Sequence, residues 1–479
     1  MTFAAYDQHD GLGLADLVRR KEVTPSELLE TAIARAEAHN PKLNAIVHKA
    51  YDLARAEAKG ALPAGPFQGV PFLIKDLGLE VAGMKRTDGT FFKDDAPDTH
   101  DALLTQRFRK AGLVIFGKTN TPEFGITGTT ESARLKPCRN PWNTEHITGG
   151  SSGGAAASVA SGIVPLANAS DGLGSIRIPA ACCGLVGMKV TQYRVPMGPS
   201  HDADIAHGYS VHHVVSRSVR DSAAMLDCID GPEADTPYPA PPKVRPFLQE
   251  VSTPPGRLRI RFTDETPSGQ PIDPEIAAAL RKTAKQLEAL GHIVEEQGLG
   301  INYRKLYAAS TAVLASNFAY SMRQRVKAMG REPRQEELEP LTWRNWKGGD
   351  HVPGHEAMRG WQTLKAMTRE IFSTFTQFDV LLTPVLSTPV PKVGFIDPVR
   401  LEPRELDKRQ AQTFGFTPPF NMTGQPSLSL PLAHSSDGLP IGMMFTGRWG
   451  DEATLYRLAA QLEQAHPWIG RKPQVWGLA

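Results

Sequence analysis

A lysine and three serines set among glycines are the residues whose types and spacing could do nucleophilic chemistry. Lys75 follows the apolar run GVPFLI, Ser151 and Ser152 lie in GGSSGG, and Ser175 lies in SDGLGSIRIP. Glycines beside a serine allow backbone N–H groups to converge on one point, as an oxyanion hole requires. The same glycines would equally suit tight turns and close packing, so both interpretations stay open from these residues alone.

Two further motifs satisfy catalytic patterns without the context that those patterns need. Residues 112–119 read GLVIFGKT and match G-x-x-x-x-G-K-T, but their β-branched and aromatic residues predict a strand rather than a phosphate-binding loop. Residues 149–153 match G-x-S-x-G, but no hydrophobic strand precedes them, and Asp and His partners cannot be singled out. We therefore assign neither nucleotide binding nor an α/β-hydrolase elbow.

The sequence predicts no metal site and no cofactor. His351 and His355 have H-x-x-x-H spacing, but Pro353 and Gly354 between them would break the helix that makes this spacing useful. A second polar cluster is interpreted as solvated loop residues; it consists of His201, Asp202, Asp204 and His207. The four cysteines lack C-x-x-C spacing, which indicates reduced thiols and a cytoplasmic location.

Charge and composition exclude several classes of protein. The chain has 479 residues with 53 Lys and Arg against 51 Asp and Glu, a formal net charge of +2, so a nucleic-acid partner is not expected. Hydrophobic content of 41% with 22% charged residues is typical of a globular protein. Residues 147–170 contain no Asp, Glu, Lys or Arg, but they are mostly Gly, Ala and Ser, so we expect no membrane span there. The first residues resemble no secretory signal.

The elements that must position these residues alternate between helix and strand, which predicts an α/β fold. Thr24-Pro25-Ser26-Glu27 is a capping box at the start of a helix, and the run before Lys75 predicts a buried strand. Further helices are expected at 101–110, 274–290, 452–465 and through most of 303–375, strands at 113–116, 257–262, 292–295 and 378–383, and a loop at 421–426.

We expect a single domain over residues 1–479. Its segments would be N-terminal helices at 1–60, a core carrying the serines at 61–231, a proline-rich loop at 232–246, a mostly helical substrate-side region at 247–375, and the C-terminal part of the core at 376–479.

The glycine and serine blocks resemble the amidase signature family. The matching stretches are GVPFLIKD, GKTNTPEFG, RNPWN, GGSSGG, SDGLGSIRIPAACCGLVGMK, FDVLLTP and PFNMTGQPSLSLP. They run along nearly the whole chain and are weakest across 232–370. Several are most similar to the bacterial branch that includes the hydrolase of cyclic nylon dimers. The resemblance implies a large mixed β-sheet covered by helices on both faces.

The resemblance also implies the roles of the site residues. Ser175 would be the nucleophile, Ser151 a bridging serine preceded by a cis peptide bond, and Lys75 the base. The backbone N–H groups of Gly172, Leu173, Gly174 and Ser175 would form the oxyanion hole. Ser152, Asp171 and Arg177 would support this structure, and Ile126, Thr127, Gly150 and Leu173 would contact the substrate.

This mechanism requires the amine of Lys75 to be uncharged near pH 7. At the reference pKa of ~10.4, making an amine neutral at pH 7 costs about 4–5 kcal/mol, and burial at a strand end would lower that pKa. The chain departs from the family pattern at Gly172, where threonine is usual, and at Leu173, where glycine or alanine is usual. The leucine side chain would narrow the site and change its substrate range.

The predicted activity is hydrolysis of a hydrophobic or aryl carboxamide, such as an anilide, a nylon-type oligomer or a carbamate. Ile126 and Leu173 would make apolar contacts, and Trp343, Trp346 and Trp361 would either line the site or fill the core. Two alternatives stay open: a glutamine-hydrolysing A-type subunit of an amidotransferase complex, and an inert binding protein. The expected partners are a small amide and water, and a homodimer stays open.

Overall fold

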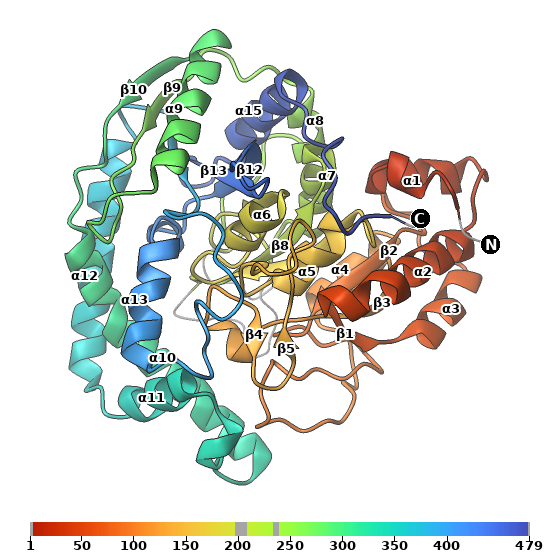
Figure 1. The fold of residues 1–479 in the computed structure, drawn as a ribbon, viewed down its shortest axis with the longest axis horizontal. Coiled ribbons are helices and arrows are strands. Elements are labelled where there is room, and N and C mark those ends of the chain that lie inside the picture. The colour runs from red at the N-terminus through yellow and green to blue at the C-terminus, as the bar shows by residue number, and fades with distance from the viewer. Residues whose placement is uncertain (1–2, 197–207, 233–238, 478–479) are drawn as a thin grey trace.

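Two adjacent β-sheets form the centre of the protein (Figure 1). The structure is a computed structural model and describes residues 3–196, 208–232 and 239–477. The large sheet has eight strands in the order β10-β9-β11-β13-β12-β7-β8-β6, and a three-stranded sheet has the order β1-β3-β2. A two-stranded ribbon pairs β4 with β5. The strands are β1 (Ile46–Lys49), β2 (Pro71–Lys75), β3 (Val114–Thr119), β4 (Glu131–Ser132), β5 (Lys136–Pro137), β6 (Leu166–Asp171), β7 (Val186–Lys189), β8 (Val211–Ser216), β9 (Arg259–Phe262), β10 (Ile293–Glu296), β11 (Val380–Pro384), β12 (Ser427–His434) and β13 (Pro440–Thr446).

The large sheet is mixed, and its strands come from distant parts of the chain. β9 pairs in parallel with both β10 and β11, whereas β13, β12, β7, β8 and β6 follow in antiparallel pairing. In the small sheet β2 and β3 are parallel, and β2 packs beside β6 of the large sheet. The strand that carries Lys75 is thereby brought next to the strand that leads to Ser175.

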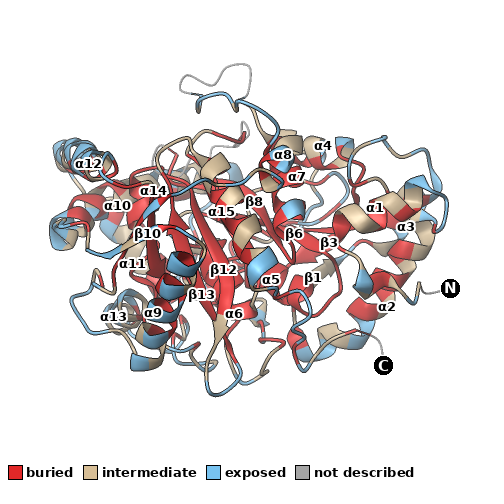
Figure 2. Cartoon of the chain, turned by 90° about the horizontal axis from the view of Figure 1, so that it is seen from above, coloured by how far each residue is buried: buried red, intermediate tan, exposed pale blue. Residues whose placement is uncertain are grey.

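Helices surround both sheets, so the expected α/β architecture with a large mixed sheet is confirmed. Figure 2 shows buried strands between helices, with α6 on one side of the sheet and α7 and α8 on the other. The helices are α1 (Gly11–Arg19), α2 (Pro25–Leu43), α3 (Tyr51–Lys59), α4 (Leu103–Lys110), α5 (Gly153–Ala160), α6 (Arg177–Cys183), α7 (Val219–Ile229), α8 (Phe247–Val251), α9 (Pro274–Ala289), α10 (Tyr303–Met329), α11 (Pro340–Gly349), α12 (Gly354–Thr374), α13 (Pro403–Phe414), α14 (Pro419–Met422) and α15 (Glu452–Ala465), with 3-10 turns η1 (Tyr6–Gln8), η2 (Glu123–Gly125) and η3 (Gln335–Glu337).

The helices α10, α11 and α12 gather at the end of the molecule opposite α1, α2 and α3 (Figure 1). They form the expected helical region, and two apolar clusters join it to the rest of the structure. One cluster contains Trp346 and packs against Phe124, which belongs to η2. The other contains Tyr209, which directly precedes the β8 region, together with residues of α10 and α12.

Local signals in the sequence predicted many elements well. The Thr24 capping box is present, with Glu27 N–H donating to Thr24 and the Glu27 carboxylate accepting from the Thr24 N–H. The expected strand before Lys75 and the helices now labelled α9 and α15 are also present. The expected loop at 421–426 is partly wrong, because α14 continues to Met422 before the chain becomes irregular. The division of the chain into segments stays a prediction.

The charge-free stretch 147–170 is buried along its whole length. It comprises the GGSSGG loop, α5 and most of β6, so its small residues permit close packing rather than a membrane span. At Gly154 an added Cβ atom would lie 2.2 Å from the Asn120 nitrogen and 2.5 Å from the Ala45 oxygen. Of the described residues, no helix is both long and apolar enough to span a membrane.

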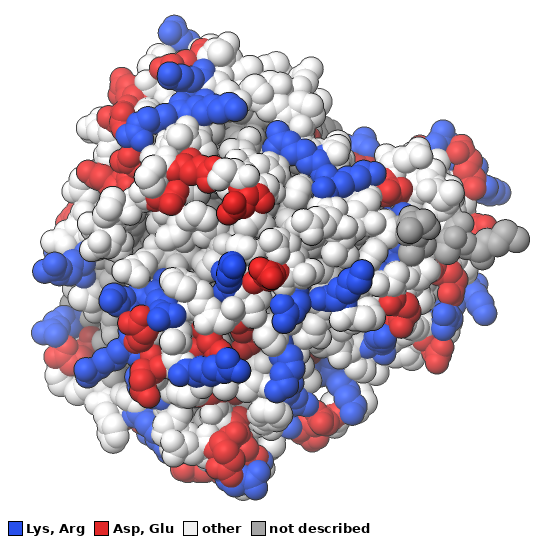
Figure 3. Space-filling view, in the orientation of Figure 1, with Lys and Arg blue, Asp and Glu red and all other residues white. Residues whose placement is uncertain are grey.

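Acidic and basic side chains are interleaved on one face of the molecule. Figure 3 shows blue and red groups interleaved on the face drawn, with much uncharged surface between them. This distribution matches the small formal net charge of +2. Such a face lacks the continuous basic stripe with which proteins usually track a nucleic-acid backbone.

Adding one methyl group at Gly154 should destabilise the fold. Because backbone atoms of Ala45 and Asn120 leave no room for a Cβ, we expect Gly154→Ala to lower the free energy of unfolding by about 3 kcal/mol. Gly348 of α11 is the control, since a Cβ there meets no atom within 4 Å. Gly348→Ala should be neutral or stabilise by up to about 1 kcal/mol. Urea denaturation measures both, and equal values would contradict the packing argument.

Candidate active site

Lys75 is the last residue of β2 and is completely buried. Its Nζ donates to Ser151 Oγ at 2.7 Å and to Ser170 Oγ at 3.0 Å. Burial lowers the pKa of Lys75 from 10.5 to about 7, and the negative charge of Asp171 only partly opposes this effect. A buried amine with hydroxyl partners can therefore be neutral near pH 7 and accept a proton.

Ser151 lies in the loop between the buried Thr148 and the start of α5. The Gly150–Ser151 peptide bond is cis, as the family resemblance implies. The neighbouring Ser152 supports this loop, because its Oγ donates to the Ser170 carbonyl at 3.2 Å and accepts from the Ser170 N–H at 3.3 Å. The loop is thereby tied to β6, beside Lys75.

Ser175 follows β6 in a short irregular segment that ends where α6 begins, and it is half-buried. The segment is held at Leu173, whose carbonyl accepts from Thr417 Oγ1 at 2.7 Å. Gly174 adopts a φ of +135°, and a Cβ atom there would lie 2.2 Å from Thr417 Oγ1. A Cβ at Gly172 would meet no atom within 4 Å, so open space adjoins the backbone just before Ser175.

Asp171 and Arg177 form a completely buried ion pair beneath the Ser175 segment. Arg177 donates to Asp171 through Nε at 2.9 Å and through Nη2 at 3.0 Å. Asn421 Nδ2 donates to Asp171 Oδ1 at 2.9 Å, and Asn421 Oδ1 accepts from Arg177 at 2.6 Å. Burial alone would raise the pKa of Asp171, but the charge and hydrogen bonds of Arg177 hold it well below its usual range. Asp171 therefore stays ionised.

This ion pair corrects one expected member of the oxyanion hole. The Gly174 N–H donates to Asp171 Oδ1 at 2.6 Å, so it is already engaged and is not free to bind an oxyanion. The Ile176 N–H likewise donates to Asp171 Oδ2 at 3.2 Å. Of the expected set, we retain Gly172, Leu173 and Ser175.

The Ser151 loop and the Ser175 segment rest on the same helix. A Cβ atom on Gly149 would lie 3.0 Å from the Cys182 Sγ and from the Pro179 Cα, so the Ser151 loop packs directly on α6. Ser175 stands just before the same helix begins. The lysine and both serines are thereby gathered around β6 and α6.

The residues expected to contact the substrate differ in their surroundings. Leu173 is 36% exposed. Ile126 is half-buried against the core, and the Thr127 hydroxyl already donates to the Thr129 carbonyl at 3.0 Å. Gly150 packs against Thr129, where a Cβ atom would lie 2.4 Å from the carbonyl oxygen. Leu173 is the best placed of the four to meet a substrate.

Comparison with known proteins identifies the family of this chain. The family model described as Amidase matches residues 27–456. The chain belongs to the amidase family. The 6-aminohexanoate-cyclic-dimer hydrolase of Paenarthrobacter ureafaciens is 37% identical over 489 residues, which cover 97% of this chain and 96% of that protein. This amidase is thus a hydrolase that acts on amide C–N bonds.

Solved structures of amidase signature enzymes have the same fold. A structure of 6-aminohexanoate cyclic dimer hydrolase complexed with substrate has a TM-score of 0.92 and 36% identity, covering 98% of this chain and 99% of that one. A bacterial aryl acylamidase of the amidase signature family has a TM-score of 0.86 and 28% identity, covering 96% of both chains. The family resemblance inferred from the sequence is confirmed.

Sequence reasoning missed several residues that shape this amidase site. Ser170 is the second partner of Lys75, yet only its place beside Asp171 in the motif could have indicated it. Thr417 and Asn421 hold the Ser175 segment from a distant part of the chain. Asn421 lies within the family-like stretch PFNMTGQPSLSLP, which was its available signal.

The motifs set aside from sequence occupy ordinary structural positions in this amidase. Most of the GLVIFGKT stretch forms β3, and Lys118 Nζ donates to the Leu79 carbonyl and to Asp98, each at 3.2 Å. His351 precedes α12 whereas His355 lies inside it, so the two do not share a helix face. The expected polar cluster of His201, Asp202, Asp204 and His207 lies outside the described residues.

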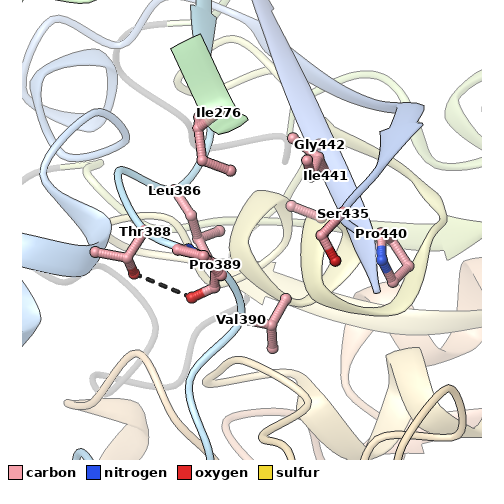
Figure 4. Close-up of a pocket in the computed structure, with 10 residues that line it drawn as sticks. Ile276, Leu386, Thr388, Pro389, Val390, Ser435, Pro440, Ile441 and Gly442 are labelled. Carbon is pink, nitrogen blue, oxygen red and sulfur yellow. Dashed lines mark hydrogen bonds between the residues drawn. The ribbon is translucent and has the colours of Figure 1, made fainter. Parts of the chain in front are cut away.

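A small cavity lies away from the catalytic candidates. Figure 4 shows it between the start of α9, the loop after β11 and the β12–β13 turn, with Leu386, Val390 and Pro440 among its walls. Its volume is about 10 Å³, which is scarcely room for one water molecule. It cannot hold an amide substrate and carries no functional assignment.

Neutralising Asp171 should destabilise the fold. Asp171→Asn would leave Arg177 charged and buried without its counter-ion, and we expect a loss of about 3–5 kcal/mol in the free energy of unfolding. The control is Asp407→Asn, which breaks an exposed pair with Arg344 and should cost less than about 1 kcal/mol. Denaturation of both variants by urea gives the comparison. A small effect of Asp171→Asn would show that Arg177 is satisfied without it.

Proposed function

We propose that this amidase cleaves a hydrophobic or aryl carboxamide through Ser175, Ser151 and Lys75, with an acyl-enzyme intermediate. The observation that carries the proposal is the 2.7 Å contact between Lys75 Nζ and Ser151 Oγ in a fully buried setting. This contact joins a base of lowered pKa to a hydroxyl that can pass on a proton.

The reaction begins with neutral Lys75. Its Nζ takes the proton of Ser151 Oγ while Ser151 takes the proton of Ser175 Oγ, and the Ser175 oxygen attacks the amide carbonyl carbon. The N–H groups of Gly172, Leu173 and Ser175 stabilise the resulting oxyanion. When the C–N bond breaks, the proton held by Lys75 returns through Ser151 to the departing amine. Water then hydrolyses the acyl-enzyme by the same relay.

An apolar substrate is supported by the surface next to Ser175. Leu173 exposes its side chain there, and Phe124 and Ile126 are half-buried on the turn that faces Ser151. The names of two similar proteins also support this class, since one is a 6-aminohexanoate-cyclic-dimer hydrolase and the other an aryl acylamidase. We infer anilides, cyclic or linear nylon-type oligomers and carbamates as the substrate class.

A reducing compartment is part of the proposal. In the described part of the chain all four cysteines are unpaired thiols, and Cys138, Cys182 and Cys183 are buried. Structural disulfides are usual in extracellular domains and rare in the cytoplasm. These thiols support our proposal of a cytoplasmic location.

Replacing the proposed catalytic groups should abolish turnover without unfolding the protein. We expect Lys75→Met and Ser175→Ala each to lower kcat/KM on anilides and alkyl amides by about 100- to 10,000-fold. The matched controls are Lys189→Met, which removes another buried lysine, and Ser161→Ala, which removes a buried helix hydroxyl. A serine-directed fluorophosphonate should label Ser175 in the wild type.

Three outcomes would contradict this mechanism: labelling of a different serine, full activity in the Lys75 variant, or no turnover by the wild type on any amide of the panel. Glutamine belongs in that panel. Hydrolysis of glutamine in preference to anilides would favour an amidotransferase subunit instead.

The activity should rise with pH through the titration of Lys75. Since the pKa of Lys75 is lowered to about 7, the lysine is protonated and unable to accept a proton below this pH. We expect kcat/KM to increase about tenfold per pH unit below pH 7 and to level off above it. The pKa of Lys189 is also lowered to about 7 by burial and by the charge of Arg177. A pH profile of Lys189→Met with the same inflection assigns the titration to Lys75, and a lost inflection would contradict that assignment.

A further inference from the structure

The η2 turn connects the proposed catalytic serines to the helical end of the molecule. Each of its three residues contacts a different part of the structure. At Gly125 an added Cβ would lie 3.1 Å from Ser151 Oγ, so the turn forms a wall beside that hydroxyl. Glu123 accepts a hydrogen bond from the Glu339 N–H at 2.8 Å, just before α11 begins.

Phe124, the middle residue of this turn, is held by α10. The Arg325 guanidinium lies over its ring at 4.8 Å from the centroid, and the Phe318 ring meets it edge-on at 5.9 Å. Phe124 also packs against the apolar cluster that contains Trp346. Two side chains of α10, those of Arg325 and Phe318, therefore pack against Phe124, which adjoins Gly125.

Arg325 also bonds the segment that follows Lys75. Its Nη2 donates to Asp88 Oδ2 at 2.8 Å, and the Asp88 carbonyl accepts from the Phe124 N–H at 2.8 Å. The Asp88 N–H in turn donates to the carbonyl of Asp76, the residue after Lys75, at 3.1 Å. One side chain of α10 thus contacts both segments that flank the Lys75–Ser151 pair.

The backbone at both contacts is in the left-handed region. Phe124 has a φ of 50° and Asp88 a φ of 52°, a conformation that disfavours residues other than glycine and requires support from surrounding contacts. Asp88 keeps further ion pairs with Arg86 at 3.6 Å and Lys93 at 3.5 Å. Loss of Arg325 would therefore remove one of the contacts that hold Phe124 without leaving Asp88 as an unpaired buried charge.

We propose that Arg325 is a positioning residue that holds Phe124 and Gly125 against Ser151, so that the Ser151 hydroxyl stays directed at Lys75. This inference rests on the proposed function, since it requires Ser151 to relay protons. It also gives the α10 helix, from the region where the family resemblance is weakest, an indirect part in the reaction, through Phe124 and Gly125.

The test compares two arginines of α10 that lie two residues apart. Arg323 pairs with Asp350 at 2.7 Å and is 66% exposed, whereas Arg325 is 10% exposed. We expect Arg325→Met to lower kcat by about tenfold or more with little change in KM, and to leave the acid limb of the pH profile in place. Arg323→Met should keep wild-type kcat. Arg325→Lys retains the charge and should restore part of the lost rate.

A crystal structure of Arg325→Met supplies a readout that needs no substrate. Departure of Phe124 from its positive φ and a longer Lys75–Ser151 contact would support the inference, whereas an unchanged turn with wild-type kcat would overturn it. Equal loss of kcat in Arg323→Met would also overturn it, because both variants would then act through general destabilisation. Failure of the proposed function is distinct: the wild type itself would be inactive on the amide panel, with Ser175 unlabelled by the fluorophosphonate.

Discussion

Lys75 can act as a base only while its amine is uncharged, and the carboxylate of Asp171 works against that state. Burial lowers the pKa of Lys75 to about 7, a change of about 5 kcal/mol in the relative stability of its two protonation states, while the charge of Asp171 opposes it. Had Asp171 been the direct partner of Lys75, the lysine would have stayed protonated. Instead Arg177 binds both carboxylate oxygens, and the Nζ of Lys75 meets the hydroxyls of Ser151 and Ser170.

The ion pair that restrains Asp171 also fixes the backbone around Ser175, the proposed nucleophile. The Asp171 carboxylate accepts from the N–H groups of Gly174 and Ile176, which flank Ser175. A fully buried pair is weak evidence for stability, because removing two charges from water costs several kcal/mol. Its value here is geometric: one carboxylate fixes the backbone on both sides of Ser175. The same pair therefore orients the proposed nucleophile, Ser175, and reduces the effect of the Asp171 charge on Lys75.

The sequence predicted the parts of the site that depend on local pattern. Lys75 was identifiable because an apolar run ends in a lysine, and the resemblance of the glycine blocks drew attention to Ser151 and Ser175. The support from Asn421 could not be derived in this way, since it lies 250 residues beyond Asp171 and meets it only through sheet topology. The hydrogen bond from the Gly174 N–H to Asp171 could not be predicted either, because the sequence does not indicate which group a loop glycine N–H binds. The sequence pattern around Arg325 predicts a helix, but it does not predict which residues of other segments Arg325 contacts.

The absence of charge from residues 147–170 follows from the same electrostatic constraint. Every residue of that stretch is buried, so a charged side chain there would need its own buried partner, and any unpaired charge would act on Lys75 through a medium of low polarity. Asp171, the first charged residue after the stretch, stands where Arg177 and Asn421 can reach it. Lys75 enters from another strand, and its amine donates to the hydroxyls of Ser151 and Ser170. The lack of charge in this stretch, which by itself could suggest a membrane span, is therefore explained by packing around Lys75, the base that we propose must remain neutral.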